Sequence, residues 1–130
     1  MQIMAIDYGE KRVGIASTDE TGAFALPRHV LTNTPSLVEN VSKLAKLWKV
    51  ERVVIGESKN FQGEDNIIMV HAREFAKALE AAGLKVVFHL EVLTSMEAKQ
   101  LQGENNMLDA SAAALILKSY IDLQNNQSSK

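Results

Sequence analysis

Three carboxylates from distant parts of the chain stand where a fold of alternating strands and helices places its active site. Asp7 follows the apolar run Ile3–Ile6, which is typical of a central strand covered on both faces. Glu91 comes directly after the apolar segment Lys85–Leu90, and Asp109 begins the last helical stretch. Because sites in such folds lie at the carboxyl ends of the strands, we expect these three side chains to converge there.

A cluster of three carboxylates repels itself unless a cation neutralises the charge. The chain has no cysteine, and its three histidines are scattered without the spacing of zinc ligands. Hard oxygen ligands favour Mg²⁺ or Mn²⁺, and these ions are typical of phosphate chemistry. The pattern therefore predicts that Asp7, Glu91 and Asp109 hold two such ions, which activate water and hydrolyse a phosphodiester.

Each carboxylate also has a structural interpretation when it is taken alone. Asp7 stands in an Asp-x-Gly sequence, which suits a turn. Asp109 suits the N-cap or first turn of a helix, and Glu91 suits the solvated end of a strand. Spacing alone leaves these interpretations open beside the catalytic one.

Composition limits the classes of protein and partner. The chain has 130 residues, enough for one domain, and a net charge of −2, so no overall basic field attracts nucleic acid or a membrane. A nucleic-acid role needs a local basic patch, for which Lys11, Arg12, Lys59 and Arg73 are candidates. No signal peptide or membrane-spanning run is recognisable, so we expect a cytoplasmic protein with no membrane partner.

The hydrophobic pattern predicts an α/β fold. Strands are predicted at Ile3–Ile6, Lys11–Ser17, Ala23–Leu31, Arg52–Gly56 and Lys85–Leu90. Helices are predicted from Ser36 to Trp48, over Asn66–Ala82, from Thr94 to Gly103 and over Met107–Leu123, with Ser36/Glu39 and Thr94/Glu97 as capping boxes and Gly83 as a stop signal. This order predicts three antiparallel strands followed by parallel crossovers, in a mixed five-stranded sheet with helices on both faces. Residues 1–124 form one domain in this prediction, and 125–130 a polar tail.

The chain resembles the YqgF/RuvX family of the RNase H-like superfamily over nearly its whole length. The segment Asp7–Ala16 is similar to the family's opening Asp-aromatic-Gly-x-Lys-x-Ile-Gly-Val-Ala. Other similar segments are Val53–Gly56 with Asn60–Gly63, Ala72–Ala76 with Leu79, and Asp109–Ala113 with Ile116 and Leu117.

The resemblance implies an RNase H-like fold and a metal-dependent nuclease. Its members were first described as candidate Holliday junction resolvases and are now associated with maturation of the 5′ end of pre-16S ribosomal RNA. It implies that Asp7 bridges two Mg²⁺ or Mn²⁺ ions and that Glu91 and Asp109 complete the site. The implied partner is structured RNA such as pre-16S rRNA, or branched DNA, bound by a monomer or a homodimer.

The same resemblance implies a role for three basic residues. Lys11, Arg12 and Arg73 would contact backbone phosphates, which positions a nucleic acid without reading its sequence. Their structural alternative is simple solvation, on a hairpin for the first two and on a helix for Arg73.

The chain departs from the family pattern near Glu91. The family's Asp-Glu-Arg is Leu90-Glu91-Val92 here, and its Gly-Leu-Pro after the fourth strand is Gly56-Glu57-Ser58. The changes remove charge and hydrogen-bond donors beside the expected site, so a catalytically weakened nucleic-acid-binding relative is one alternative. Another is a nucleotide-binding protein of the actin and sugar-kinase type, which would require two such domains around the nucleotide.

Overall fold

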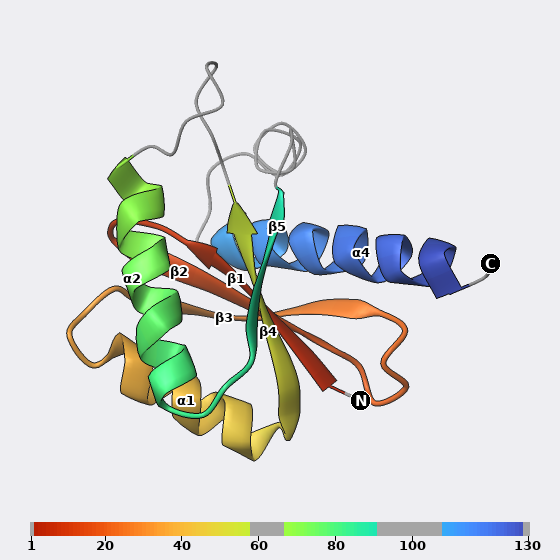
Figure 1. The fold of residues 1–130 in the computed structure, drawn as a ribbon, viewed down its shortest axis with the longest axis horizontal. Coiled ribbons are helices and arrows are strands. Elements are labelled where there is room, and N and C mark those ends of the chain that lie inside the picture. The colour runs from red at the N-terminus through yellow and green to blue at the C-terminus, as the bar shows by residue number, and fades with distance from the viewer. Residues whose placement is uncertain (1, 58–66, 91–107, 129–130) are drawn as a thin grey trace.

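The computed structural model describes residues 2–57, 67–90 and 108–128, without the side chains of residues 90, 108, 109 and 125–128. It contains one five-stranded sheet with strand order β3-β2-β1-β4-β5 (Figure 1). The strands are β1 (Gln2–Tyr8), β2 (Arg12–Thr18), β3 (Ala25–Thr32), β4 (Val50–Glu57) and β5 (Val86–Leu90). The first three strands are antiparallel, and β4 and β5 run parallel to β1, so the predicted mixed sheet is confirmed.

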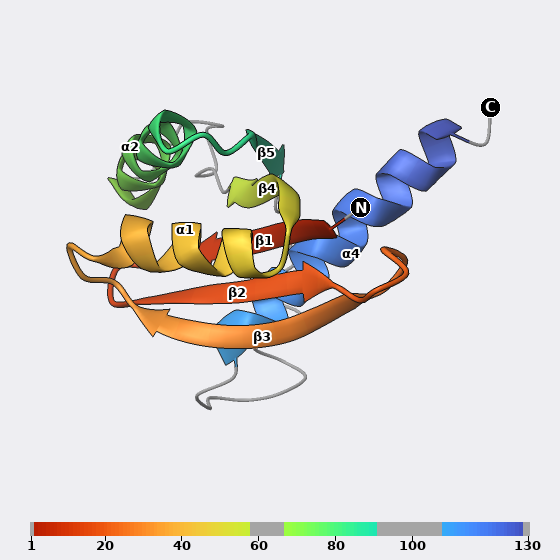
Figure 2. The same cartoon turned by 90° about the horizontal axis from the view of Figure 1, so that it is seen from below.

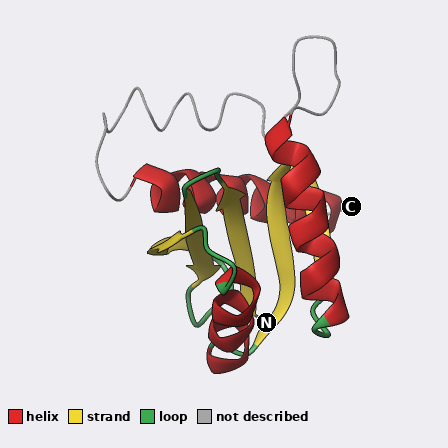
Figure 3. Ribbon diagram, turned by 90° about the vertical axis from the view of Figure 1, so that its left-hand side faces the viewer, coloured by secondary structure: helices red, strands yellow, loops and turns green. Residues whose placement is uncertain are grey.

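Helices cover both faces of the sheet, as Figures 2 and 3 show. The helices α1 (Leu37–Leu47) and α2 (Ile67–Ala81) lie on one face, and α4 (Leu108–Ser128) lies on the other. Within the part of the chain that the model describes, no helix is both long enough and apolar enough to cross a membrane.

The alternation of side chains along β1 separates two hydrophobic cores. Met4 and Ile6 belong to the core under α1 and α2, whereas Ala5 belongs to the core under α4. Because successive side chains of a strand point to opposite faces, Asp7 lies on the same face as Ala5. The small Ala5 and Ala16 let the alanine-rich α4 pack closely on the sheet, so the strand pattern sets the side on which Asp7 is presented.

The predicted capping box of α1 does not form. Ser36 occupies the N-cap position, but its side chain makes no capping hydrogen bond. Its backbone, with φ −87° and ψ 2°, lacks the extended conformation that aims an N-cap hydroxyl at the free N–H groups. Thr34 stabilises the turn before the helix instead: its hydroxyl oxygen accepts the Ser36 N–H at 3.2 Å, and its carbonyl accepts the Leu37 N–H at 3.0 Å. The second predicted box, at Thr94, lies outside the described residues.

The predicted stop of α2 at Gly83 is confirmed. Gly83 has φ +96°, a left-handed conformation that glycine adopts without a Cβ clash. Its N–H donates to the Glu80 carbonyl at 3.0 Å, and the Leu84 N–H donates to the Leu79 carbonyl at 3.1 Å. This is a Schellman motif, which satisfies carbonyls that the helix end would otherwise expose. The last helix, by contrast, runs to Ser128, past its predicted end at Leu123, because no glycine or proline interrupts it.

The end of α1 yields a stability prediction. Lys49 follows this helix with φ +56°, in the left-handed region that disfavours side chains other than glycine. Lys49→Gly is therefore expected to raise the free energy of unfolding by about 0.5 kcal/mol, once the larger entropy of glycine in the unfolded chain is subtracted. Urea denaturation measures the change. Lys46→Gly, in the last turn of the same helix, is the matched control and should destabilise by about 1 kcal/mol; equal losses in both variants would contradict the prediction.

Candidate functional site

Asp7 lies at the carboxyl end of the central strand with glycines beside it. Its partner on β2 is Gly14, and Gly56 on β4 follows Ile55, the partner of Ile6. Gly56 in turn pairs with His89 on β5. Asp7 is half-buried, and its register partner on β2 is a glycine, which has no side chain. The small residue at this position lies in the β1–β2 pair, at the level of Asp7.

The turn between β1 and β2 is held rigidly. A Cβ atom at Gly9 would collide with the backbone carbonyl oxygen of Arg12. The side-chain amide of Asn33 donates to the Gly9 carbonyl at 2.9 Å, and the Asn33 N–H donates to the Lys11 carbonyl at 2.9 Å. Lys11 and Arg12 are exposed on this turn, which directly follows the end of β1. Nothing in the local sequence indicates the role of Asn33, because its contacts span 22 residues or more.

Arg73 lies on the other side of the sheet from Asp7. Its Nη2 is 2.7 Å from Oε2 of Glu57 at the end of β4, and its guanidinium lies 4.9 Å from the centre of the Phe88 ring. Glu57 shares the face of Ile55, which packs under α1 and α2. The contacts of Arg73 therefore connect α2 with β4 and β5, and its contact with phosphate stays a prediction.

This ion pair gives a second stability prediction. Arg73→Met should lower the free energy of unfolding by about 1 kcal/mol, because it removes a partly exposed pair and a cation–π contact. Glu57→Gln removes the carboxylate but keeps the cation, so it separates the two roles of Arg73. If Arg73 also binds phosphate, only Arg73→Met weakens RNA binding, as measured by fluorescence anisotropy in EDTA. Unchanged stability of Arg73→Met would show that the pair contributes nothing.

The other two predicted carboxylates lie at the limits of the described structure. Glu91 is outside the described residues. Asp109 belongs to the first turn of α4, and its side chain is also outside them. Figure 1 shows that α4 begins at the end of the sheet where β1 ends, and Figure 2 shows that its first turn lies on the β3 side of the sheet. Among the side chains that the model describes, no three His, Cys, Asp or Glu residues form a cluster able to hold a metal ion.

His89 on β5 makes two side-chain contacts with α4 that the sequence did not predict. A hydrogen bond of 2.8 Å joins its Nε2 to Oγ of Ser119 on α4. Its ring meets the ring of Tyr120 edge to face, with centroids 5.9 Å apart. Burial lowers the pKa of His89, so the ring is neutral at neutral pH. A strand histidine with no ligand spacing gave no signal for this contact, because its partner is 30 residues away.

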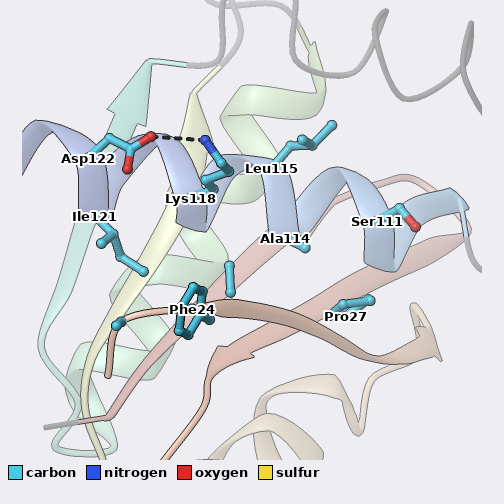
Figure 4. Close-up of a pocket in the computed structure, with 10 residues that line it drawn as sticks. Phe24, Pro27, Ser111, Ala114, Leu115, Lys118, Ile121 and Asp122 are labelled. Carbon is cyan, nitrogen blue, oxygen red and sulfur yellow. Dashed lines mark hydrogen bonds and ion pairs between the residues drawn. The ribbon is translucent and has the colours of Figure 1, made fainter. Parts of the chain in front are cut away.

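A groove of about 520 Å³ lies between β3 and α4 on the same sheet face (Figure 4). Its walls are mostly apolar and include Phe24, whose residue surface is 67% exposed. Ser111, in the first turn after Asp109, lines one end, and the Lys118–Asp122 ion pair of 3.1 Å lies towards the other. The face that carries Asp7 is therefore hollowed along the side of α4.

Comparison with known proteins places this arrangement in a family. The family model described as "RuvX: Holliday junction resolvase" matches residues 1–123. A protein of Syntrophus aciditrophicus named "Putative pre-16S rRNA nuclease" is 35% identical, with 94% of this chain and 89% of the relative covered. A protein of Bordetella parapertussis with the same name is 33% identical, with 92% of each chain covered.

Solved structures share the fold at lower sequence identity. RuvC of Thermus thermophilus has a TM-score of 0.60 at 16% identity, with 95% of this chain and 97% of that chain covered. The fowlpox virus Holliday junction resolvase has a TM-score of 0.56 at 15% identity, with 95% and 99% covered. These structures support the fold, and the family match and the relatives over 30% identical decide the membership: the chain belongs to the RuvX family.

Proposed function

We propose that this protein is a divalent-metal-dependent nuclease that hydrolyses phosphodiester bonds during 5′-end processing of pre-16S ribosomal RNA. The observation that carries the proposal is Asp7, a half-buried carboxylate at the end of the central strand with glycine on both sides. The names of the relatives, which cover nearly the whole chain, support the RNA substrate. This role would place the protein in the cytoplasm, where ribosomes are assembled.

The proposed metal ligands are Asp7, Glu91 and Asp109, with Mg²⁺ or Mn²⁺ as the ions. An all-carboxylate donor set suits these hard cations, and the glycine that pairs with Asp7 on β2 has no side chain that would compete for the same position. When bound, two ions would polarise the scissile phosphate and promote loss of a proton from the attacking water. The chain's own contribution is the rigid position of Asp7, fixed by pairing of β1 with strands on both sides.

Lys11 and Arg12 are the proposed phosphate contacts closest to Asp7 in sequence. Both are exposed on the turn that Asn33 anchors, so their backbone is already ordered before substrate arrives. Such contacts would hold the nucleic-acid backbone over the end of β1 without selecting its sequence. Arg73 is retained as a third proposed contact, for which its pair with Glu57 would have to open or be shared with the phosphate.

The direct test uses a labelled RNA that carries the 5′ precursor extension of 16S rRNA. We expect cleavage in Mg²⁺ or Mn²⁺ and none in EDTA, because the carboxylates act through the ions. Binding that persists in EDTA, with no cleavage at any Mn²⁺ concentration, would contradict the proposal. That result would favour the catalytically weakened nucleic-acid-binding relative.

A Holliday junction resolvase is the second candidate, favoured by the description of the family model. Symmetrical cutting of a four-way junction requires two active sites related by a two-fold axis, so this activity predicts a homodimer on the junction. Incubation with an end-labelled junction and with the precursor RNA separates the two functions. Paired, symmetrical nicks in the DNA with no RNA cleavage would replace the first proposal by the second.

A further inference from the structure

A hollow of about 320 Å³ lies between the edge strand β3 and α1, on the face of the sheet that α1 covers (Figure 2). Its walls combine two leucines that pack against the core with three exposed polar side chains: Leu31, Leu44, His29, Asn40 and Lys43. Ligand sites in proteins commonly join an apolar wall to a few polar groups that fix the orientation of the ligand. This hollow is separate from the groove beside α4, which lies on the other face of the sheet.

The ring of Trp48, the residue that follows α1, holds the imidazole of His29 in place. The two rings are nearly parallel, with an angle of 11° between their planes and 5.7 Å between their centroids. The guanidinium of Arg28 lies 5.6 Å from the centre of the Trp48 ring, and its Nε donates to Oγ of Ser17 at 2.8 Å. This hydrogen bond uses one of the five N–H donors of the arginine. A stack of planar groups with a cation beside it therefore borders the hollow.

The charges around the hollow suit an anionic ligand. Nζ of Lys43 is 3.4 Å from Oε1 of Glu39, and the two side chains are 71% and 67% exposed. An ion pair this exposed contributes little free energy, so a phosphate can compete with Glu39 for the ammonium group. Arg28 and Lys43 outnumber Glu39, which makes the local charge positive although the whole chain has a net charge of −2. Planar stacking groups and cations together match a nucleotide, which offers a flat base and an anionic phosphate.

The hollow and Asp7 lie at the same level along the strands. Asp7 pairs with Gly14 on β2, and Gly14 pairs with Val30 on β3, the residue next to His29. Two interstrand spacings, about 10 Å, separate Asp7 from this part of β3. Because β3 is an edge strand, a nucleic-acid chain that lies at Asp7 on one face can pass round it to the hollow on the other.

We propose that the hollow between β3 and α1 binds an unpaired nucleotide of RNA, with the base stacked beside His29 and the phosphate in contact with Lys43 and Arg28. The inference rests on the proposed function, because it gives the RNA substrate a second contact outside the nuclease site. The residues of the hollow touch neither the metal ions nor the scissile phosphate in this assignment. They hold an unpaired segment that flanks the cleaved bond, and they raise its affinity without any part in the chemical step.

The test uses Trp48 as a reporter, since it is the only tryptophan of the chain. The full chain is titrated with a short unstructured RNA in EDTA, so that metal-dependent binding makes no contribution. We expect saturable quenching of the Trp48 fluorescence. By anisotropy of the labelled RNA, His29→Ala should weaken binding about tenfold through loss of stacking. Lys43→Gln should weaken it about fivefold at 0.1 M salt and reduce its salt dependence by about one phosphate contact.

Matched controls come from α2, where His71 and Lys77 are also exposed. His71→Ala and Lys77→Gln make the same chemical changes away from the hollow and should leave the RNA affinity and the Trp48 quenching unchanged. Losses as large as those of His29→Ala and Lys43→Gln would show that RNA binds any basic part of the surface, and would overturn the proposal.

Two further results would also overturn it. Unquenched Trp48 at saturating RNA would show that no base lies at the hollow. Equal quenching by tripolyphosphate, which has charge but no base, would assign the hollow to anions in general. Failure of the proposed function is a separate result: RNA binding then stays sensitive to His29, but no cleavage occurs in Mg²⁺ or Mn²⁺. Failure of this inference alone leaves cleavage intact and RNA affinity insensitive to His29.

Discussion

Replacement of Asp7 by asparagine is expected to abolish metal-dependent cleavage and to leave the fold intact. The amide has nearly the shape of the carboxylate but lacks its charge, so it would hold divalent cations only weakly. A loss of about 4 kcal/mol of transition-state stabilisation corresponds to a fall of roughly 10³-fold in kcat/KM. The variant should keep the fold of the wild type, because the amide occupies nearly the same volume as the carboxylate at this half-buried position. RNA cleavage and urea denaturation measure the two effects.

Asp122→Asn is the matched control for this substitution. Asp122 is exposed on α4, where it pairs with Lys118 four residues earlier. The same chemical change there should leave cleavage within about twofold of wild type, because an exposed pair of this kind contributes a few tenths of a kcal/mol. Wild-type cleavage by Asp7→Asn would remove Asp7 from the mechanism, and the central-strand carboxylate would then be the turn former of the structural interpretation.

Gly9→Ala is expected to lower both the stability of the protein and its activity. The new Cβ would collide with the Arg12 carbonyl oxygen, a backbone atom that has no rotamer by which to move away. The β1–β2 turn must distort to relieve the collision. Inserting an extra methyl group into a tightly packed site costs about 2 kcal/mol of folding free energy. The distortion would also displace Lys11 and Arg12, which lie on or directly after this turn. The cleavage rate should therefore fall by more than the increase in the unfolded fraction of the protein accounts for.

Gly83→Ala separates the general cost of adding a methyl group from the cost at this turn. No atom lies within 4 Å of a Cβ built at Gly83, but φ there is +96°. The substitution should therefore cost about 1 kcal/mol through backbone strain alone and leave the activity per folded molecule unchanged. Thermal unfolding and RNA cleavage of both variants make the comparison. A Gly9→Ala protein with wild-type stability and activity would show that the turn adapts freely.

The features predicted correctly from sequence are those that neighbouring residues decide. The four-residue apolar run before Asp7 predicted a strand covered on both faces, and β1 is the central strand with one core on each side. The glycine after α2 predicted its end because only the local backbone conformation matters there. The order of the elements predicted the sheet, since chain connectivity leaves few ways to join antiparallel and parallel strands.

The features that sequence could not predict depend on residues far apart in the chain. Spacing favoured a cap by Ser36, but the turn at Thr34 gives its backbone another conformation. The family resemblance implied that Arg73 contacts phosphate, and its helix position alone implied simple solvation, whereas the fold brings Glu57 to 2.7 Å from it. The contact between His89 and Ser119 likewise exists only once β5 and α4 are packed together. Partners of this kind follow from tertiary structure and not from periodicity.

The most direct test of the account is a crystal structure of the protein soaked in Mn²⁺, with the ions located by anomalous scattering. We predict Mn²⁺ coordinated by the carboxylate of Asp7, on the α4 face of the sheet, and shared with Glu91 and Asp109. Glu91 and Asp109 turned away from Asp7, with no Mn²⁺ bound to Asp7 at saturating concentration, would contradict the central claim.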